Sequence, residues 1–99
     1  MEFIMSREIR TSAKAVVIKD DKLLAIKLND GNEEFYILPG GGQDGEEQLP
    51  QTVEREVKEE TGINVLCGDL LFVIEGVHGE EFHRVDLVFA CEYLGLSED

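Results

Sequence analysis

Three glutamates near the end of a predicted helix are the side chains of this sequence best suited to chemistry. At about 100° per residue, Glu56, Glu59 and Glu60 fall within one sector near the end of a helix predicted over residues 48–61. Acidic groups in a last helical turn oppose the helix dipole, and like charges four residues apart repel each other. A hard divalent cation such as Mg²⁺ offsets both costs, because it binds carboxylate oxygens together with water and phosphate. The pattern therefore predicts a magnesium site, in which the neighbouring Arg55 orients one carboxylate.

The helix that carries these glutamates has clear signals for its ends and its buried side. Pro50 is tolerated in the first turn, and Gly62 is placed to end the helix. Apolar residues recur every four positions and form the buried stripe: Leu49, Val53 and Val57. Glu60 falls in the sector of this stripe, so we expect its carboxylate to be shielded from solvent and to need a partner. An outer ion pair of Glu54 and Lys58 is also expected.

A run of three glycines precedes the helix. Gly40, Gly41 and Gly42 follow a predicted strand over residues 34–38 and the strand-ending Pro39. Consecutive glycines after a strand describe backbone that bends sharply or approaches a ligand closely. A flexible connector is the other explanation. Because a glutamate-rich helix comes next, we predict that these glycines bind the substrate.

The remaining elements are predicted strands. They cover residues 13–18, 22–28, 34–38, 63–65, 70–75 and 84–93. Turns are expected at residues 20–21 and 29–32, and a loop at residues 76–81. Three strands, one helix and further strands predict an α+β fold, with a mixed sheet and a helix on one face. The other face is expected to lack cover.

Bulk composition limits the classes of partner. The net charge is −13, with 42% hydrophobic and 31% charged residues, which suits a soluble globular fold and opposes binding to a nucleic-acid polymer or an anionic membrane. No apolar run suggests a membrane span or a signal peptide, so a cytoplasmic location is expected. Cys67 and Cys91 are interpreted as buried free thiols. In so acidic a protein, a solvated helix surface is the alternative explanation of the glutamate cluster.

The residues now described resemble the Nudix box of the Nudix hydrolase family. That signature reads Gly, five residues, Glu, seven residues, Arg-Glu-apolar, one residue, Glu-Glu, one residue, Gly-apolar. This sequence matches it at Gly41, Glu47, Arg55, Glu56, Val57, Glu59, Glu60, Gly62 and Ile63. Pro39 and Gly40 before the box, and residues 83–89 after it, are also similar to the family.

The resemblance implies a fold of the α/β/α sandwich type, in which a mixed sheet carries the Nudix helix on one face. Over residues 1–99 it implies a single domain. Family domains continue with a further strand and a second helix that covers the other face, and these are missing here. We therefore expect a chain shortened at its C-terminus, or a partner such as a second copy in a homodimer, because an uncovered apolar face favours association.

The resemblance also implies a metal-dependent enzyme. Its activity would be hydrolysis of a pyrophosphate linkage in a small molecule, either a nucleoside diphosphate linked to another moiety or a nucleoside triphosphate. Mg²⁺ would be the cofactor, with Mn²⁺ as a substitute. Glu56, Glu59 and Glu60 would bind the metal, joined by the carbonyl of Gly40 and by Glu47 as a supporting or second-metal ligand.

Two questions stay open in this comparison. The first is the identity of the general base. Glu56 or Glu59 is preferred, and Glu80 or Glu81 in the later loop are alternatives. Arg55 is expected to be a further catalytic residue. The second is turnover itself, because a nucleotide-binding or regulatory module without catalysis is the rival interpretation. The retained glutamates argue against that rival, since a non-catalytic relative has no physical reason to keep a costly acidic cluster.

Overall fold

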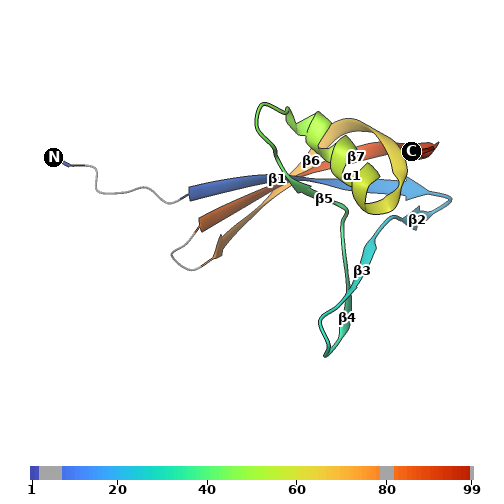
Figure 1. Ribbon diagram of the computed structural model, residues 1–99, viewed down its shortest axis with the longest axis horizontal. Coiled ribbons are helices and arrows are strands. Elements are labelled where there is room, and N and C mark those ends of the chain that lie inside the picture. The colour runs from blue at the N-terminus through green and yellow to red at the C-terminus, as the bar shows by residue number, and fades with distance from the viewer. Residues whose placement is uncertain (3–7, 79–81, 99) are drawn as a thin grey trace.

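A mixed β-sheet with one helix packed on it forms the body of the protein (Figure 1). The computed structural model describes residues 1–2, 8–78 and 82–98. The main sheet has the order β2-β1-β7-β6, and β5 pairs with β1 beside β2; β1 and β7 are parallel and the other pairs antiparallel. The elements are β1 (Glu8–Lys19), β2 (Lys22–Leu23), β3 (Ile26–Asn29), β4 (Glu34–Ile37), β5 (Gly40–Gly42), α1 (Leu49–Thr61), β6 (Ile63–His78) and β7 (Phe82–Leu96). The predicted α+β architecture is confirmed.

The core lies between α1 and one face of the sheet. Val53 and Val57 of α1 are completely buried and Leu49 packs partly against them, so the predicted stripe is confirmed. The sheet contributes the rest of this core, in particular Ala13, Ala15, Val17, Val65, Phe89 and Cys91. Because successive strand residues point to opposite faces, the alternation on β1 fixes which of its residues face away from the helix.

Helix α1 begins and ends close to the predicted residues. Gln48 and Gln51 form a capping box at its start, with Pro50 in the first turn. Gly62 adopts a left-handed conformation, with φ of 73°, and its amide donates to the Lys58 carbonyl at 2.9 Å. A glycine at this position ends the helix without the steric cost that a Cβ would add.

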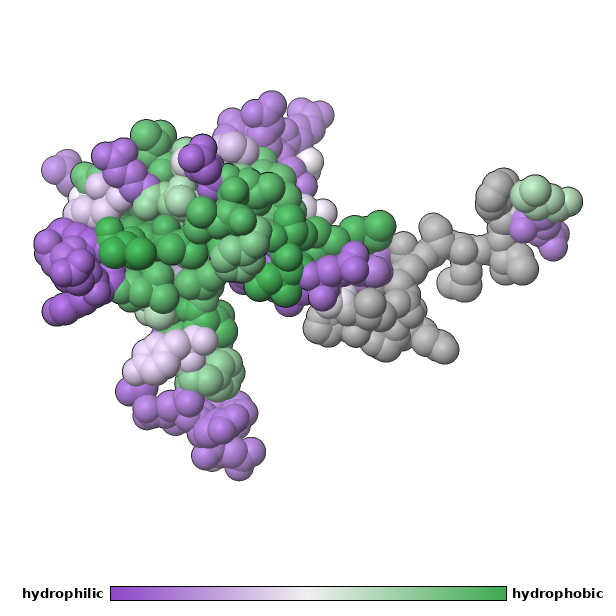
Figure 2. All heavy atoms as spheres, turned by 180° about the vertical axis from the view of Figure 1, so that it is seen from behind, coloured by the Kyte–Doolittle hydropathy of each residue, from purple (hydrophilic) through white to green (hydrophobic). Residues whose placement is uncertain are grey.

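The opposite face of the sheet is not covered by a helix in the part of the chain that the structure describes. Figure 2 shows this side, where apolar side chains gather over the sheet. Phe72 and Ile74 of β6 pair with Val88 and Asp86 of β7 on this face, and they are 47% and 51% exposed. The expected lack of cover is therefore confirmed. Helix α1 has neither the length nor the apolar character needed to cross a membrane, and the described residues contain no other helix.

Three strand predictions were wrong in detail. Residues 22–28 divide into β2, which pairs with β1, and β3, which turns away to pair with β4 in a separate hairpin. The glycine run is itself a short strand, β5. The two segments predicted at 63–65 and 70–75 are one strand, because β6 passes residues 67–72 with bulges. Gly68 lies so close to β7 that a Cβ would be 2.7 Å from the Ala90 carbonyl oxygen, so this glycine continues the sheet and does not end a strand.

The two cysteines are cross-strand partners, Cys67 on β6 and Cys91 on β7. Both are free, and Cys91 is buried, but Cys67 is only partly buried, so the prediction of two buried thiols was wrong for Cys67. Burial raises the pKa of the Cys91 thiol to about 12, which keeps it protonated and unreactive at neutral pH.

Candidate active site

The glycine strand lies directly under the glutamate helix. Gly41 of β5 pairs with Ala13 of β1. Ala13 belongs to the core that α1 covers, so Gly41 is on the same face of the sheet. A Cβ at Gly41 would lie 2.5 Å from the carboxyl carbon of Glu56, and a Cβ at Gly40 would lie 2.1 Å from the Ala13 carbonyl oxygen. Glycine is therefore required at position 40, where a side chain would displace the neighbouring strand, whereas a side chain at position 41 would displace the Glu56 carboxyl group.

Arg55 is the centre of the glutamate cluster. Its guanidinium donates to Glu47 at 2.7 and 3.0 Å, to Glu56 at 2.9 Å and to Glu59 at 3.2 Å. It also donates to the Gly42 carbonyl oxygen at 3.2 Å, which joins the helix to the glycine strand. Arg55 was expected to orient one carboxylate. It donates to three and forms an ion pair with a fourth, that of Asp44 at 3.6 Å, because a guanidinium carries five donors in a planar fork.

Glu47 is the most firmly held of these carboxylates, with its side chain 16% exposed. It accepts hydrogen bonds from Arg55, from the Thr52 hydroxyl at 2.7 Å and from the Asp44 amide at 3.1 Å. These donors, Arg55 first and Thr52 second, lower the pKa of Glu47 to about 2. Thr52 was not predicted as part of the site. Its place in the first helical turn, five residues after Glu47, is the one signal that would have suggested it.

Glu60 has the partners that its position predicted. The residue as a whole is exposed, unlike Val53 and Val57, but its carboxyl group is not freely solvated. Partial burial is the main cause that raises the pKa of Glu60, followed by a hydrogen bond with Glu56, while a backbone hydrogen bond with Gly40 opposes this shift. Two carboxyl groups are thus held against each other beside the glycine strand.

Glu54 has a contact that was not predicted, while its expected ion pair with Lys58 stays a prediction. Glu54 accepts a hydrogen bond at 2.9 Å from the backbone amide of Cys67, at the start of the bulged part of β6. This bond ties α1 to the sheet on the side away from Arg55.

The predicted metal ligands lie together, but not yet as a formed metal site. Among the described residues, no group of three or more histidine, cysteine or acidic side chains is arranged to hold a metal ion. Three of the glutamates point at Arg55 instead. The donor set still fits a divalent cation, because the Glu56 and Glu60 carboxyl groups lie against each other and the Gly40 backbone is beside them. The alternative bases Glu80 and Glu81 lie outside the described residues.

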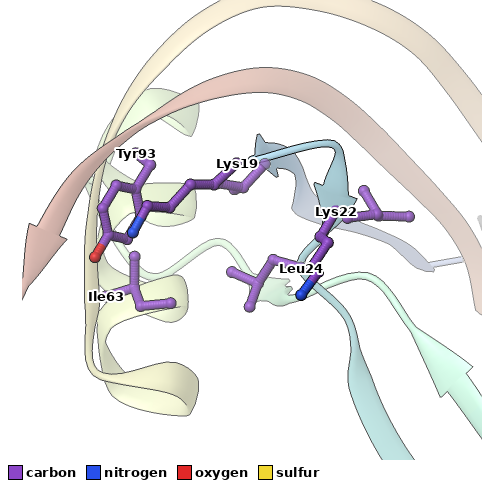
Figure 3. Close-up of a pocket in the computed structure, with 7 residues that line it drawn as sticks. Lys19, Lys22, Leu24, Ile63 and Tyr93 are labelled. Atoms are coloured by element: carbon purple, nitrogen blue, oxygen red, sulfur yellow. The ribbon is translucent and has the colours of Figure 1, made fainter.

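A separate cavity lies near the C-terminal end of the helix, where α1 leads into β6 (Figure 3). It has a volume of about 210 Å³, and its lining includes Val17, Leu24 and Ile63. The Lys19 ammonium lies over the Tyr93 ring, 4.3 Å from its centre. This cavity shares no lining residue with the glutamate cluster.

Fold and site together define an α+β domain in which a glutamate–arginine cluster on a helix is packed over a glycine strand. Residues 9–97 match the NUDIX domain family. An ADP-ribose pyrophosphatase of Methanocaldococcus jannaschii is 33% identical over 82 residues, which are 81% of this chain and 48% of that protein. The chain belongs to the NUDIX family, whose hydrolases generally use a divalent metal.

Solved structures agree on the fold. A NUDIX hydrolase from Nitrosomonas europaea superposes with a TM-score of 0.78 at 23% identity, covering 93% of this chain and 64% of that one. An ADP-ribose pyrophosphatase from Streptococcus suis gives a TM-score of 0.71 at 25% identity, covering 89% and 63%. The chain therefore spans about half of the M. jannaschii protein and less than two thirds of these two structures.

Proposed function

We propose that this domain hydrolyses a pyrophosphate linkage with the help of Mg²⁺. The substrate would be a nucleoside diphosphate linked to another moiety, or a nucleoside triphosphate. The observation that carries the proposal is the contact of Glu56 with both Gly41 and Glu60, which places two neighbouring carboxyl groups against the glycine strand. A cation between carboxylates and phosphate oxygens suits such a site.

The metal would be held by Glu56, Glu59 and Glu60, supported by Glu47 and the Gly40 carbonyl, and Mn²⁺ would substitute for Mg²⁺. When bound, it would neutralise charge on the phosphate oxygens and acidify a bound water. For Glu59 to take part, it must exchange its bond at 3.2 Å with Arg55 for the cation. This exchange is feasible because the Glu59 side chain is 57% exposed, whereas Glu47 has two further donors that hold it in place.

The protein groups have separable roles in this proposal. Arg55 positions Glu47 and Glu56, and it holds the glycine strand through its hydrogen bond to the Gly42 carbonyl. The glycines Gly40, Gly41 and Gly42 let the diphosphate approach the backbone. A carboxylate then takes a proton from the attacking water. Glu56 or Glu59 is the preferred base, with Glu80 or Glu81 as alternatives.

ADP-ribose is the first substrate to test, because two of the similar proteins are named ADP-ribose pyrophosphatases. A nucleotide-binding module without turnover remains the second candidate. The observation that favours it is that Arg55 occupies the centre of the glutamates, where it competes with a cation for the same oxygens.

The two candidates are separated by a chromatographic assay for the nucleoside monophosphate product, run on ADP-ribose and on a panel of nucleoside diphosphate derivatives and triphosphates. It is run with Mg²⁺, with Mn²⁺ and with a chelator, on the unmodified chain and on Glu59→Gln. Hydrolysis that needs the metal and falls about 100-fold or more in the variant supports the hydrolase. Binding of a panel member without hydrolysis supports the binding module.

A further inference from the structure

The cavity near the C-terminal end of α1 combines apolar walls with two basic side chains. Its volume is about 210 Å³, whereas an apolar cavity of about 150 Å³ is enough to hold benzene. Val17 is buried, and Leu24 and Ile63 are partly buried where they line the space. The cavity therefore suits an apolar group about the size of one aromatic ring.

The basic side chains of the cavity are Lys19 and Lys22, which lie directly opposite each other across the hairpin of β1 and β2. Like charges in directly opposite positions on neighbouring strands destabilise the pair. The turn fixes this register, because Asp20 and Asp21 both have a positive φ, of 52° and 61°, as a two-residue hairpin turn of type I′ requires. Among the described residues, neither lysine forms an ion pair. The hairpin thus holds two positive charges together without a counter-charge.

Tyr93 fixes the position of one of these charges. The Lys19 ammonium lies 4.3 Å from the centre of the Tyr93 ring. Figure 3 shows the Lys19 side chain extending from β1 to this ring, while Lys22 lies on the other side of the cavity, near Leu24. The face of an aromatic ring attracts a cation without a hydrogen-bond acceptor of its own, so the N–H donors of Lys19 remain available for a ligand.

An occupant has to suit both the walls and the charges. A small inorganic anion would pair with the lysines but leave the apolar walls in contact with water. A neutral hydrocarbon would cover the walls but leave the two ammonium groups opposed. A carboxylate accepts hydrogen bonds at two oxygens, one for each lysine. An aromatic ring joined to it fits the volume and packs well against the ring of Tyr93.

We propose that this cavity is a binding site for a small aromatic carboxylate. The ring of the ligand lies against Leu24 and Ile63, and its carboxylate accepts hydrogen bonds from Lys19 and Lys22. The site shares no lining residue with the glutamate cluster around Arg55. The inference is therefore independent of the proposed hydrolysis.

Titration with benzoate tests the inference without substrate or metal. Amide NMR signals of Leu24 and Ile63 report on the cavity, those of Gly41 and Glu56 report on the glutamate cluster, and a chelator is present throughout. Benzamide supplies the same ring without the charge, and acetate supplies the charge without the ring. We expect benzoate to shift the cavity signals but not the cluster signals, and to bind at least about tenfold more tightly than either analogue.

The decisive variants are Lys19→Gln and Lys22→Gln. Both lysines are exposed, and exposed ion pairs have modest energies, so each substitution should weaken benzoate binding about threefold and the double variant about tenfold. Benzamide binding should not change. Lys27→Gln is the matched control, since Lys27 is also exposed, lies on β3 outside the cavity and removes the same charge.

Leu24→Trp tests the same site by filling it. Leu24 packs against the core from the wall of the cavity, so an indole ring there should abolish the binding of benzoate and of benzamide. If this variant does not fold, the exposed lysine variants decide the question. The inference is overturned if benzoate leaves the signals of Leu24 and Ile63 unshifted, if benzamide binds as tightly as benzoate, or if the lysine variants bind benzoate as Lys27→Gln does.

Discussion

Close approach between Gly41 and Glu56 determines how the glutamate cluster meets the backbone. The Glu56 side chain is 19% exposed and lies over Gly41, so its carboxylate fills the space that any other residue at position 41 would need. Neighbouring Gly42 has no atom within 4 Å of its would-be Cβ. A side chain at position 41 would therefore collide with Glu56, whereas a side chain at position 42 would meet no other atom.

The first prediction concerns this difference. Gly41→Ala should displace Glu56 and lower hydrolysis about 100-fold, since small misplacements of catalytic groups have effects of that order. It should also lower the melting temperature, whereas Gly42→Ala should not, because its methyl group projects into open space. Thermal melts and the chromatographic hydrolysis assay measure both effects. An unchanged rate in Gly41→Ala would show that Glu56 is not needed where it lies.

The pH dependence of Glu47 gives the second prediction. Its pKa is lowered from 4.5 to about 2 in the folded protein, so its stabilising contribution is present above pH 4.5 and is lost as the pH falls toward 2. Glu47→Gln should therefore melt lower than the unmodified chain at neutral pH, and the difference should shrink as the solution is acidified. Melts in a chelator across this range are the measurement. A difference that stays constant with pH would contradict the ion pair with Arg55.

Prediction from sequence succeeded best where one local pattern decides the structure. The buried stripe and the ends of α1 follow from residue spacing, and the match from Gly41 to Ile63 placed the glutamates on the right element. The central position of Arg55 did not follow, because the helix periodicity places Glu56 and Glu59 relative to Arg55 but says nothing of Glu47 or the Gly42 carbonyl across the loop.

At the scale of elements, the contact between α1 and β6 joins the site to the sheet. The Glu54 carboxylate accepts from the Cys67 amide, which β6 presents where its regular pairing with β7 is interrupted. The sequence did not reveal this bond, because Gly68 and Asp69 resemble a turn between two strands. Only the close approach of Gly68 to Ala90 shows that the strand continues.

The third prediction tests that contact. Glu54→Ala should destabilise the fold by about 1 kcal/mol, because the Cys67 amide loses its acceptor, and chemical denaturation measures the loss. Glu54→Gln retains an acceptor oxygen and should recover most of the stability. If both variants unfold at the denaturant concentration of the unmodified chain, the bond does not join helix and sheet in solution.

For the whole molecule, the uncovered face and the edge strand β6 carry apolar surface that is not buried in the core. Phe72 pairs with Val88 and is 47% exposed, within the run of half-exposed residues 70–74. A long apolar edge favours pairing with another chain. The net charge of −13 opposes self-association at low salt, because like-charged chains repel until the charges are screened.

The fourth prediction is a homodimer that forms through this face. Sedimentation should show a monomer–dimer equilibrium that shifts toward the dimer as salt is added. Phe72→Lys should restore the monomer, while Tyr36→Lys, at a 66% exposed position in the separate β3–β4 hairpin, should leave the equilibrium unchanged. A chain that stays monomeric at all salt concentrations would show that a second copy does not cover the face.

The central claim is that the glutamates around Arg55 form a divalent-cation centre. The most direct test is a thermal melt with and without Mg²⁺, on the unmodified chain and on the Glu56→Gln, Glu60→Gln double variant. Because a ligand that binds only the folded state stabilises it, we predict that Mg²⁺ raises the melting temperature of the unmodified chain and leaves that of the double variant unchanged. An equal response of both proteins, or none in either, would contradict the claim.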